Sequence, residues 1–397
     1  MASARRSKAR RPRFSVVTIV CNEASRLPKL LASLKEFRER GGEVVVLDTG
    51  STDGTADVAK DAGCRVRLEP RRFRGRLGES RADRINRTFS RGGEGPFLQA
   101  DQMLFDEGAA RDHAGHLARN PFQLGMDGSD VADSLDLDFL ERAVRSGESD
   151  LLLFETRRRH ENRWFIEHRQ YFHDRRTMTW SGRAHSFAAP RRGCVPRVAI
   201  LPRDRLRISH HTDPERLRGH QFAGVALDAL SAPSSPHRLF LLGRELGVRG
   251  YFKSALAVFL SLERNDVPAP MRSAALSMAA TCVVGSGGGA EDEAPTLWFK
   301  ASRRDPTRRD PLLQLARHAL SKGEFQGAAS FSAAALAIPG RVGFSELEEN
   351  LLEGAHAILY WALFWLGRRD EARPHFEICR TLDPLNPVYL NHAHLFG

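Results

Sequence analysis

The alternation of two patterns over the first 68 residues most constrains what this chain can fold into. Continuous apolar runs at 14–20 (FSVVTIV) and 43–47 (EVVVL) are typical of strands buried on both faces of a parallel sheet. Between them, leucines repeat at helical spacing and predict a helix over 24–38. A second helix at 56–62 leads to a third strand at 65–68. This series predicts an α/β fold with right-handed crossovers.

The same pattern continues more weakly to about residue 230. Residues 69–100 are rich in arginine and glycine and predict a loop or mobile flap. Helices are expected at 106–119 and 135–145. Strands are expected at 121–126, 151–156 and 164–172, with the last one antiparallel and near an edge. The basic residues 1–12 predict a disordered tail, so the α/β domain is expected to span 13–230.

The character of the sequence changes at 232–236 (APSSP), after which alanine- and leucine-rich amphipathic segments replace the strand pattern. Helices are predicted at 237–247, 250–264, 269–284, 311–321, 324–337, 347–367 and 369–382. Units that begin at 250, 323 and 367 share a turn glycine followed by a small alanine and a large phenylalanine. They resemble tetratricopeptide repeats. The sequence therefore predicts an all-α, tetratricopeptide-like domain over 237–397.

The net charge of +11, carried mostly by arginine, favours anionic partners. Sugar nucleotides, anionic membrane headgroups and nucleic acid all fit, and the alternative is a solvated, arginine-biased surface. The sequence contains no apolar run near the ~18 residues of a membrane span and no secretory signal. The five cysteines are scattered and form no CxxC pair. We therefore expect a cytoplasmic protein, with peripheral membrane association left open.

Polar residues follow two neighbouring strands of the predicted sheet. Asn22 and Glu23 come after the first strand, and Asp48 begins the segment DTGSTDGT (48–55) after the second. Ligands of open parallel sheets bind at the carboxyl ends of the strands, so these side chains are candidates for one binding cleft. The glycines and hydroxyl groups of the second segment also suit a turn with a helix cap, which is the plain structural alternative.

Together these two segments resemble the opening motifs of family 2 glycosyltransferases of the GT-A fold. In that family one strand ends in N-E and the next in D-x-G-S-x-D-G-T. The resemblance implies a Rossmann-like, mostly parallel GT-A sheet and a nucleotide-sugar donor, here a UDP-sugar. It also implies inverting transfer to an acceptor hydroxyl with help from a carboxylate base. By the same resemblance, the donor site comprises Asn22, Glu23, Asp48, Ser51 and Asp53.

The family usually carries a D-x-D metal motif, and two segments could supply it. LQADQ has one acid, Asp101, whereas MDGSD has two, Asp127 and Asp130, which we prefer. Their hard oxygen ligands suit Mg²⁺ or Mn²⁺. By resemblance, Arg111 lies near the donor diphosphate. Ser129 occupies the place of the central acid, which leaves metal dependence open, and an ordinary Asp-Gly turn is the alternative.

The segment WSGRAH (180–185) resembles a W-x-G-x-x-H-E motif of some family members. His185 would then approach the metal or the diphosphate, but Ser186 replaces the final glutamate. If that glutamate is the base in relatives, another acid such as Glu155 or Asp213 must serve here. The pair at 210–211 (HH) is a weaker candidate, because adjacent side chains on a strand point to opposite faces.

Three functions remain open at this point. The first is transfer of a sugar to a glycan, a lipid-linked saccharide or a protein. The second is transfer to modified bases of DNA, which the basic stretch 71–87 motivates but no nucleic-acid-binding motif supports. The third is a non-catalytic scaffold whose repeats bind a protein partner, which Ser129 and Ser186 motivate.

Overall fold

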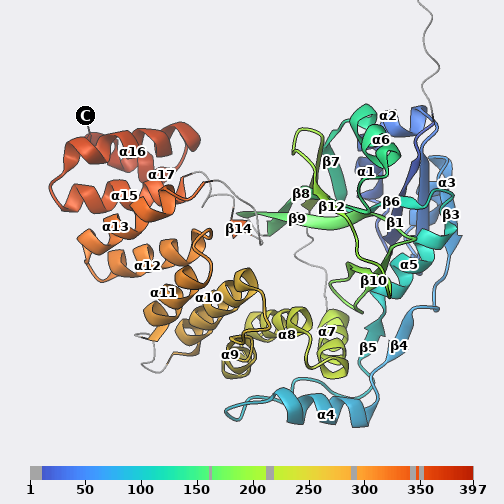
Figure 1. Ribbon diagram of the computed structural model, residues 1–397, viewed down its shortest axis with the longest axis horizontal. Helices are drawn as coiled ribbons and strands as arrows, with labels where there is room; N and C mark the ends of the chain where they lie inside the picture. Colours follow the sequence, from blue (N-terminus) through green and yellow to red (C-terminus); the bar gives the residue numbers. More distant parts are fainter. Residues whose placement is uncertain are drawn as a thin grey trace, which may run out of the picture. The chain divides into compact units, whose positions relative to one another are not determined.

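The structure is a computed structural model that describes residues 11–160, 163–211, 219–287, 293–339, 346–347 and 353–396 (Figure 1). The described residues form two compact units. The α/β unit takes those within 1–78, 100–162 and 167–228, and the helical unit takes those within 79–99, 163–166 and 229–397.

The α/β unit is built on a mixed, mostly parallel sheet, which confirms the expected fold class. Its strands are β1 (Phe14–Val20), β2 (Glu43–Asp48), β3 (Arg65–Leu68), β6 (Phe122–Asp127), β7 (Asp130–Leu135), β8 (Leu151–His160), β9 (Arg163–Asp174), β12 (Val198–Ile200) and β13 (Leu206–His211). The strand order is β3-β2-β1-β6-β9-β8-β13-β7, and β12 pairs with β8. β1 runs parallel to β2 and β6, whereas β9 is antiparallel to β6 and β7 is antiparallel to β13.

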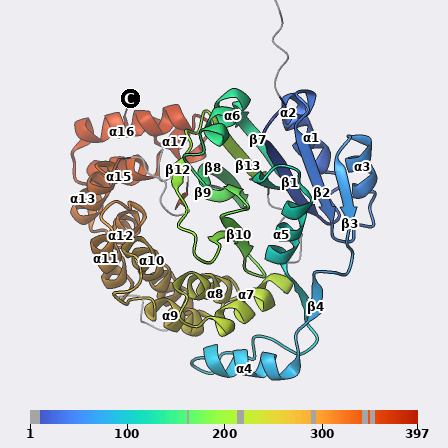
Figure 2. The ribbon, with the colours of Figure 1, turned by 45° about the vertical axis from the view of Figure 1, so that its right-hand side comes forward.

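Helices cover both faces of this sheet because the central strands are apolar on both. The helices are α1 (Leu27–Ser33), α2 (Lys35–Glu39), α3 (Thr55–Asp61), α5 (Glu107–Leu117) and α6 (Leu137–Ser146). Even-numbered residues of β1 and β2, such as Val16 and Val46, pack in a core with α1 and α6. Odd-numbered residues, such as Val17 and Val45, pack against α5, which lies along β1 and β2 (Figure 2).

Two small ribbons flank the sheet. β4 (Arg74–Arg76) pairs with β5 (Met103–Phe105), and β10 (Met178–Ser181) pairs with β11 (Phe187–Pro190). The turn between β10 and β11 docks on the start of α5. The N–H groups of Glu107 and Gly108 donate to the carbonyls of Arg183 and Gly182, each at 3.0 Å. Glycine is needed at 108, because a Cβ there would lie 2.7 Å from the Gly182 carbonyl oxygen.

From residue 236 onward, the helical unit is a succession of helices in which each described helix packs on the next, as a tetratricopeptide-like region requires. Its elements are α4 (Glu79–Phe89), α8 (Pro236–Val248), α9 (Phe252–Leu260), α10 (Ala269–Ser286), α11 (Ala294–Arg304), α12 (Asp310–Ser321), α13 (Phe325–Leu336), β14 (Glu346–Leu347), α15 (Gly354–Trp365), α16 (Arg369–Leu382), α17 (Pro387–His392) and the 3-10 turn η2 (Ala393–Leu395). The division between the units falls within α7 (Gly219–Ser231). Across the described helices, none has the length and apolarity that crossing a membrane demands.

Four local predictions were wrong. The strand expected near an edge at 164–172 is β9, which lies inside the sheet between β6 and β8. The expected flap at 69–100 contains helix α4, whose buried residues Ala82, Ile85 and Phe89 form a narrow stripe among arginines. The expected helix at 24–38 breaks at Leu34, which leaves helical geometry with φ −98° and ψ 14°. Of the expected helix at 347–367, Leu347 lies in β14 and α15 covers Gly354–Trp365, while residues 348–352 lie outside those that the structure describes. Apolar spacing alone does not separate a short strand from the first turn of a helix.

Candidate functional site

The loops after β1 and β2 are held together by side chains that the sequence assigned to the donor nucleotide. Asn22 adopts φ +56°, and its Oδ1 accepts a hydrogen bond from the Thr52 N–H at 2.8 Å. The Asn22 N–H donates to Ser51 Oγ at 2.9 Å. Asp53 accepts from the Ala24 N–H at 3.0 Å. These side chains therefore hold the two loops at the carboxyl edge of the sheet, and much of their hydrogen-bonding capacity is used within the loops.

Glu23, the remaining donor-site candidate from the first motif, is buried and faces the other half of the site. Its N–H donates to Thr55 Oγ1 at 2.8 Å, and its carboxylate lies 3.4 Å from Arg26 Nη1. A Cβ on Gly128 would lie 2.8 Å from Glu23 Cγ. Glu23 thus packs directly on the turn between β6 and β7 and joins the first motif to the acidic segment.

Asp48 is the last residue of β2 and is only 1% exposed. Its Oδ1 accepts hydrogen bonds from the N–H groups of Gly50 at 2.8 Å and Ser51 at 2.7 Å. Its Oδ2 is buried and has no hydrogen-bond partner within the described chain. A buried carboxylate oxygen without a donor is costly, so a ligand N–H at this position would be stabilising.

Asp48 and Asp127 lie at the same edge of the sheet, on the two neighbours of β1. Asp48 is the register partner of Val20, and Asp127 is the register partner of Ile19. Two strand spacings put their Cα atoms about 10 Å apart. Because consecutive residues of β1 point to opposite faces, the two carboxylates also point to opposite faces. The two carboxylates therefore lie at the same edge of the sheet, as expected, but they do not share a face of it.

Asp127, Asp130 and His210 form a cluster in which one ligand atom of each lies within 4.8 Å of the others. Asp130 is fully buried. Its Oδ2 accepts from the Asp127 N–H at 2.7 Å, and its Oδ1 lies 2.7 Å from His210 Nδ1. The cluster therefore brings the two predicted acids together with His210 of β13, which was a weaker candidate from the sequence.

Two buried arginines neutralise these acids. Arg111 of α5 pairs with Asp127 through Nη2. Arg169 of β9 lies 3.0 Å from Asp130 Oδ2 and 3.6 Å from Asp127 Oδ2. Burial alone would raise the pKa of the Asp127 carboxyl, but the charges of Arg111, Arg169 and His210 outweigh it and hold that pKa well below its ordinary value. In turn, the acids hold the pKa of each arginine above its ordinary value against the effect of burial.

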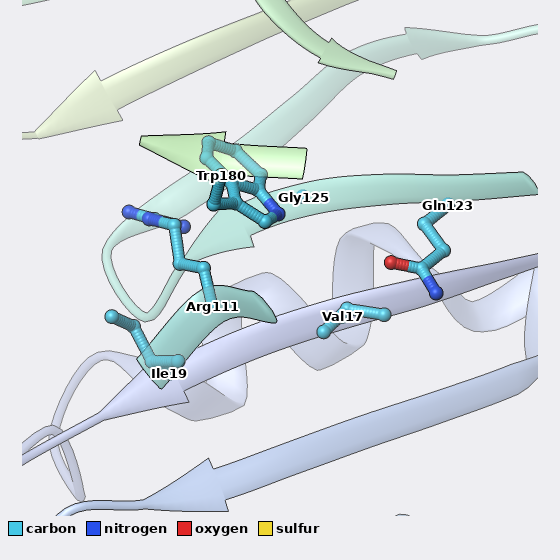
Figure 3. A pocket seen from close by; sticks show the side chains of 6 residues that line it. All are labelled: Val17, Ile19, Arg111, Gln123, Gly125 and Trp180. Carbon is cyan, nitrogen blue, oxygen red and sulfur yellow. The ribbon is translucent and has the colours of Figure 1, made fainter. Parts of the chain in front are cut away.

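Aromatic rings pack against the guanidinium groups of both arginines. The Arg111 guanidinium lies 4.8 Å from the Tyr171 ring centroid and 5.1 Å from that of Trp180. The Arg169 guanidinium lies 4.7 Å from the Tyr171 ring centroid. The Trp180 ring packs on Gly125. A Cβ at position 125 would lie only 3.1 Å from that ring, so glycine leaves room for it. Figure 3 shows Arg111 and Trp180 toward one end of a small cavity that Val17, Ile19, Gln123 and Gly125 also line.

Glu107 supplies a carboxylate at the place where the sequence motif lost one. Ser186, which replaces the expected glutamate, donates from Oγ to Glu107 Oε1 at 2.8 Å. Arg111 Nε donates to the same Glu107 oxygen at 2.9 Å and to Ser186 Oγ at 3.1 Å. Glu107 was not among the residues predicted from the sequence. Its spacing of four residues from Arg111 on one helix was the signal that could have found it.

The remaining candidates lie apart from the Asp127 cluster or outside the described residues. His185 sits in the turn at 182–186 with φ +49° and is not a member of the cluster. Glu155 pairs with Arg207 at 2.9 Å, and Arg207 precedes His210 by three strand residues, about 10 Å. Asp101 is exposed and is not in the cluster. Asp213 lies outside the described residues.

Arg169 was also missed, although the strand that carries it has a clear pattern. Arg169, Tyr171 and His173 alternate along β9 and share a face, as the two-residue period of a strand requires. His173 is buried, and its ring centroid lies 5.2 Å from that of Trp180. Burial lowers the pKa of His173 to about 4.

Comparisons with known proteins agree with the resemblance of the first segment. Residues 15–87 match the family model described as glycosyl transferase family 2. This match includes both loops that carry Asn22 and Asp48, and it supports a glycosyltransferase. A comparison with curated proteins gives no match.

Solved structures resemble parts of the chain at low identity. PilF of Pseudomonas aeruginosa is 14% identical over 44% of this chain and 72% of its own, with a TM-score of 0.36. A thermophilic TPR protein of Thermus thermophilus is 18% identical over 44% and 88%, with a TM-score of 0.33. TarS of S. aureus is 16% identical over 74% and 53%, with a TM-score of 0.35.

Proposed function

We propose that the protein is a glycosyltransferase that moves a sugar from a UDP-sugar to an acceptor hydroxyl with inversion at the anomeric carbon. Asp48 is the observation that carries the proposal. It lies within the segment that matches glycosyl transferase family 2, at the carboxyl end of a central strand. One of its oxygens is engaged by the loop and the other is buried without a donor.

The orphaned oxygen of Asp48 favours a particular kind of base. Uracil presents an N3–H donor, which a carboxylate oxygen accepts in a charge-assisted hydrogen bond. Cytosine presents an acceptor at the same ring position and would repel the carboxylate. Asn22, Ser51 and Asp53 support this recognition indirectly, because they fix the two loops around Asp48.

The diphosphate of the donor would lie toward the cluster of Asp127, Asp130 and His210. A divalent ion, which the sequence predicts there, would supply positive charge to the departing diphosphate. The residues as arranged do not fit such an ion. Asp130 is fully buried and both of its oxygens are engaged, and Asp127 is paired with Arg111 and lies near Arg169. An ion would have to displace these partners.

Transfer with inversion needs a base for the acceptor hydroxyl. As the base takes that proton, the hydroxyl oxygen bonds to the anomeric carbon and the bond from that carbon to the diphosphate oxygen breaks. We favour Glu107, because Arg111 links it directly to Asp127. Glu155 is less suitable since it pairs with Arg207 farther along β13. His185 and Asp213 remain predictions from sequence.

The acceptor we propose is a glycan, a lipid-linked saccharide or a protein. Stacked helices of the kind seen in the helical unit present extended surfaces for binding a partner. A thermal-shift screen of nucleoside diphosphates and nucleotide sugars tests the proposal. A ligand at about 100 times its Kd stabilises the folded state by about 2.7 kcal/mol, so UDP and at least one UDP-sugar should raise the unfolding midpoint. An equal response to UDP, CDP and ADP, or none to any of them, would contradict it.

A second candidate is a scaffold without catalysis, which the ion-paired acids and Ser186 favour. The two candidates differ in turnover. The glycosyltransferase releases UDP from its UDP-sugar, slowly to water and faster with an acceptor. The scaffold binds the UDP-sugar but forms no UDP from it. Measurement of UDP release over a panel of acceptors therefore separates the two candidates.

A further inference from the structure

We infer that Arg111 and Arg169 form a cationic clamp for the donor diphosphate, so that donor binding needs no divalent metal ion. The inference rests on the proposed function, since it names the groups that hold part of that donor. It replaces the sequence expectation of Mg²⁺ or Mn²⁺ at Asp127 and Asp130 with two side chains of the chain itself.

Asp127 and Asp130 already have partners within the protein. Asp130 accepts hydrogen bonds from the Asp127 N–H and from Arg169 on one oxygen, and it contacts His210 with the other. Asp127 pairs with Arg111 on Oδ1, and its Oδ2 lies 3.6 Å from Arg169. A divalent ion would have to break these pairs and then remain beside two guanidinium charges. Repulsion between like charges at such distances is strong in a partly buried site.

Arg111 and Arg169 keep N–H donors that the protein does not use. A guanidinium carries five N–H donors. Arg111 uses Nε and Nη2, and Arg169 uses Nη1. Within the residues that the structure describes, Arg111 Nη1 and Arg169 Nε and Nη2 make no hydrogen bond to the protein. Planar guanidinium donors of this kind match the oxygens of phosphate groups.

Both guanidinium groups are held in position by their neighbours. Tyr171 lies within 4.8 Å of both guanidinium groups, and Trp180 lies 5.1 Å from that of Arg111. The ion pairs to Asp127 and Asp130 also hold the two arginines in place. Charges that are already in position need no reorganisation when negative charge develops on a leaving group. The arginines can therefore do for the diphosphate what a bound cation does elsewhere.

The clamp predicts that metal does not control UDP binding to the full-length wild-type protein. UDP titrated by calorimetry in EDTA should bind with a Kd within about threefold of that in Mn²⁺. Mn²⁺ added to the protein alone should keep the electron paramagnetic resonance signal of the free ion. UDP binding that requires Mn²⁺, or that Mn²⁺ tightens more than about tenfold, would overturn the clamp.

Variants separate the diphosphate from the nucleoside. Arg169→Gln should weaken UDP binding in EDTA by about tenfold or more and leave uridine binding unchanged. Arg197→Gln is the matched control, because Arg197 is a well-exposed arginine of the same unit that pairs with Asp150. Equal UDP affinity for Arg169→Gln and the wild type would overturn the proposal.

Asp127→Asn gives a test of opposite sign. If Asp127 bound a metal ion, this change would weaken UDP binding in Mn²⁺. In the clamp it removes the anion that competes with diphosphate for Arg111, so UDP affinity should rise or stay the same. A cooperative unfolding transition shows that the variant is folded, and if it is not, the wild-type comparison in EDTA and Mn²⁺ still decides.

The outcomes also distinguish this inference from the function on which it rests. UDP that binds only with Mn²⁺ contradicts the clamp and leaves the UDP-sugar transferase intact. A wild-type protein that binds UDP in neither condition contradicts the proposed function, and the clamp with it.

Discussion

At the scale of single residues, the two oxygens of Asp48 have different environments. Oδ1 holds the loop that follows β2, and Oδ2 faces no donor. Asp48→Asn keeps an acceptor for the loop and can place an amide N–H where the base N–H would lie. We expect UDP affinity to fall by about tenfold to a hundredfold, since loss of a charged acceptor costs about 1.5–3 kcal/mol.

Calorimetric titration of UDP measures this change. Asp57→Asn is the control, because Asp57 is an exposed acid on the nearby helix α3. A Kd for Asp48→Asn equal to that of the control would show that Asp48 does not contact the base.

His173 makes the stability of the α/β unit depend on pH. Its pKa is about 4 in the folded protein and 6.5 ordinarily. Between these values the unfolded chain binds a proton that the folded protein does not, so acidification lowers the free energy of unfolding. The stabilisation is complete above pH 6.5 and is lost as the pH falls toward 4. At pH 5 the loss from this residue should be roughly 2 kcal/mol.

Denaturant unfolding of the wild type and of His173→Phe at pH 7 and pH 5 measures this contribution. The variant should lose distinctly less stability between the two values, whereas His116→Gln, at an exposed position, should behave as the wild type does. Identical pH dependence in His173→Phe and the wild type would rule out His173 as the cause.

At the scale of elements, the junction between α5 and the turn at 182–186 positions both Arg111 and Glu107. Gly108 permits this contact, because a Cβ there would lie 2.7 Å from the Gly182 carbonyl oxygen. We expect Gly108→Ala to cost about 1–3 kcal/mol of stability through overpacking and to weaken UDP binding by shifting Arg111. Gly75→Ala is the control, since a Cβ there meets nothing within 4 Å. Thermal unfolding and UDP titration that match the control would contradict the role of this junction.

Elements with a strong period were predictable from sequence, and those stabilised by distant partners were not. β1 and β2 could be predicted from their apolar runs, because a strand buried on both faces has an uninterrupted apolar sequence. α4 was not predicted because only three buried residues are interspersed among eight polar or charged ones along a short helix. β7 was not predicted because it contains two aspartates and a serine, and its pairing with β13 holds it in place.

The same distinction applies to the site. Asp48, Asp127 and Asp130 follow strands in sequence, so their position at the carboxyl edge could be predicted. Arg169 and His210 come from strands that are distant in sequence, and only the sheet order brings them to Asp130. Pairing of both acids with arginine could not be read from the motif, because it depends on this order.

At the scale of the whole molecule, the segment 79–99 belongs to the helical unit although it interrupts the α/β unit in sequence. Glu94 accepts hydrogen bonds from the N–H groups of Lys253 and Ser254 at the start of α9, at 2.9 Å and 2.8 Å. The rings of Phe97 and Tyr251 lie 4.7 Å apart. A carboxylate that caps the N–H groups at the start of a helix typically contributes about 1 kcal/mol.

Glu94→Ala should therefore release this segment from α9. We expect faster amide exchange at residues 253 and 254 and faster proteolysis within 90–96, because two N–H groups lose their acceptor. Asp83→Ala, an exposed acid on α4, provides the comparison. Exchange and cleavage rates equal to those of Asp83→Ala would show that Glu94 does not anchor the segment.

The location of the donor nucleotide tests the account most directly. Photo-crosslinking with an azido-uridine analogue of UDP-glucose, followed by mass spectrometry, identifies the peptides that contact the base. We expect labelling within residues 20–24 or 48–55, and excess UDP should suppress it. Labelling confined to residues 229–396, or labelling that UDP does not suppress, would contradict a donor site at the carboxyl edge of β1 and β2.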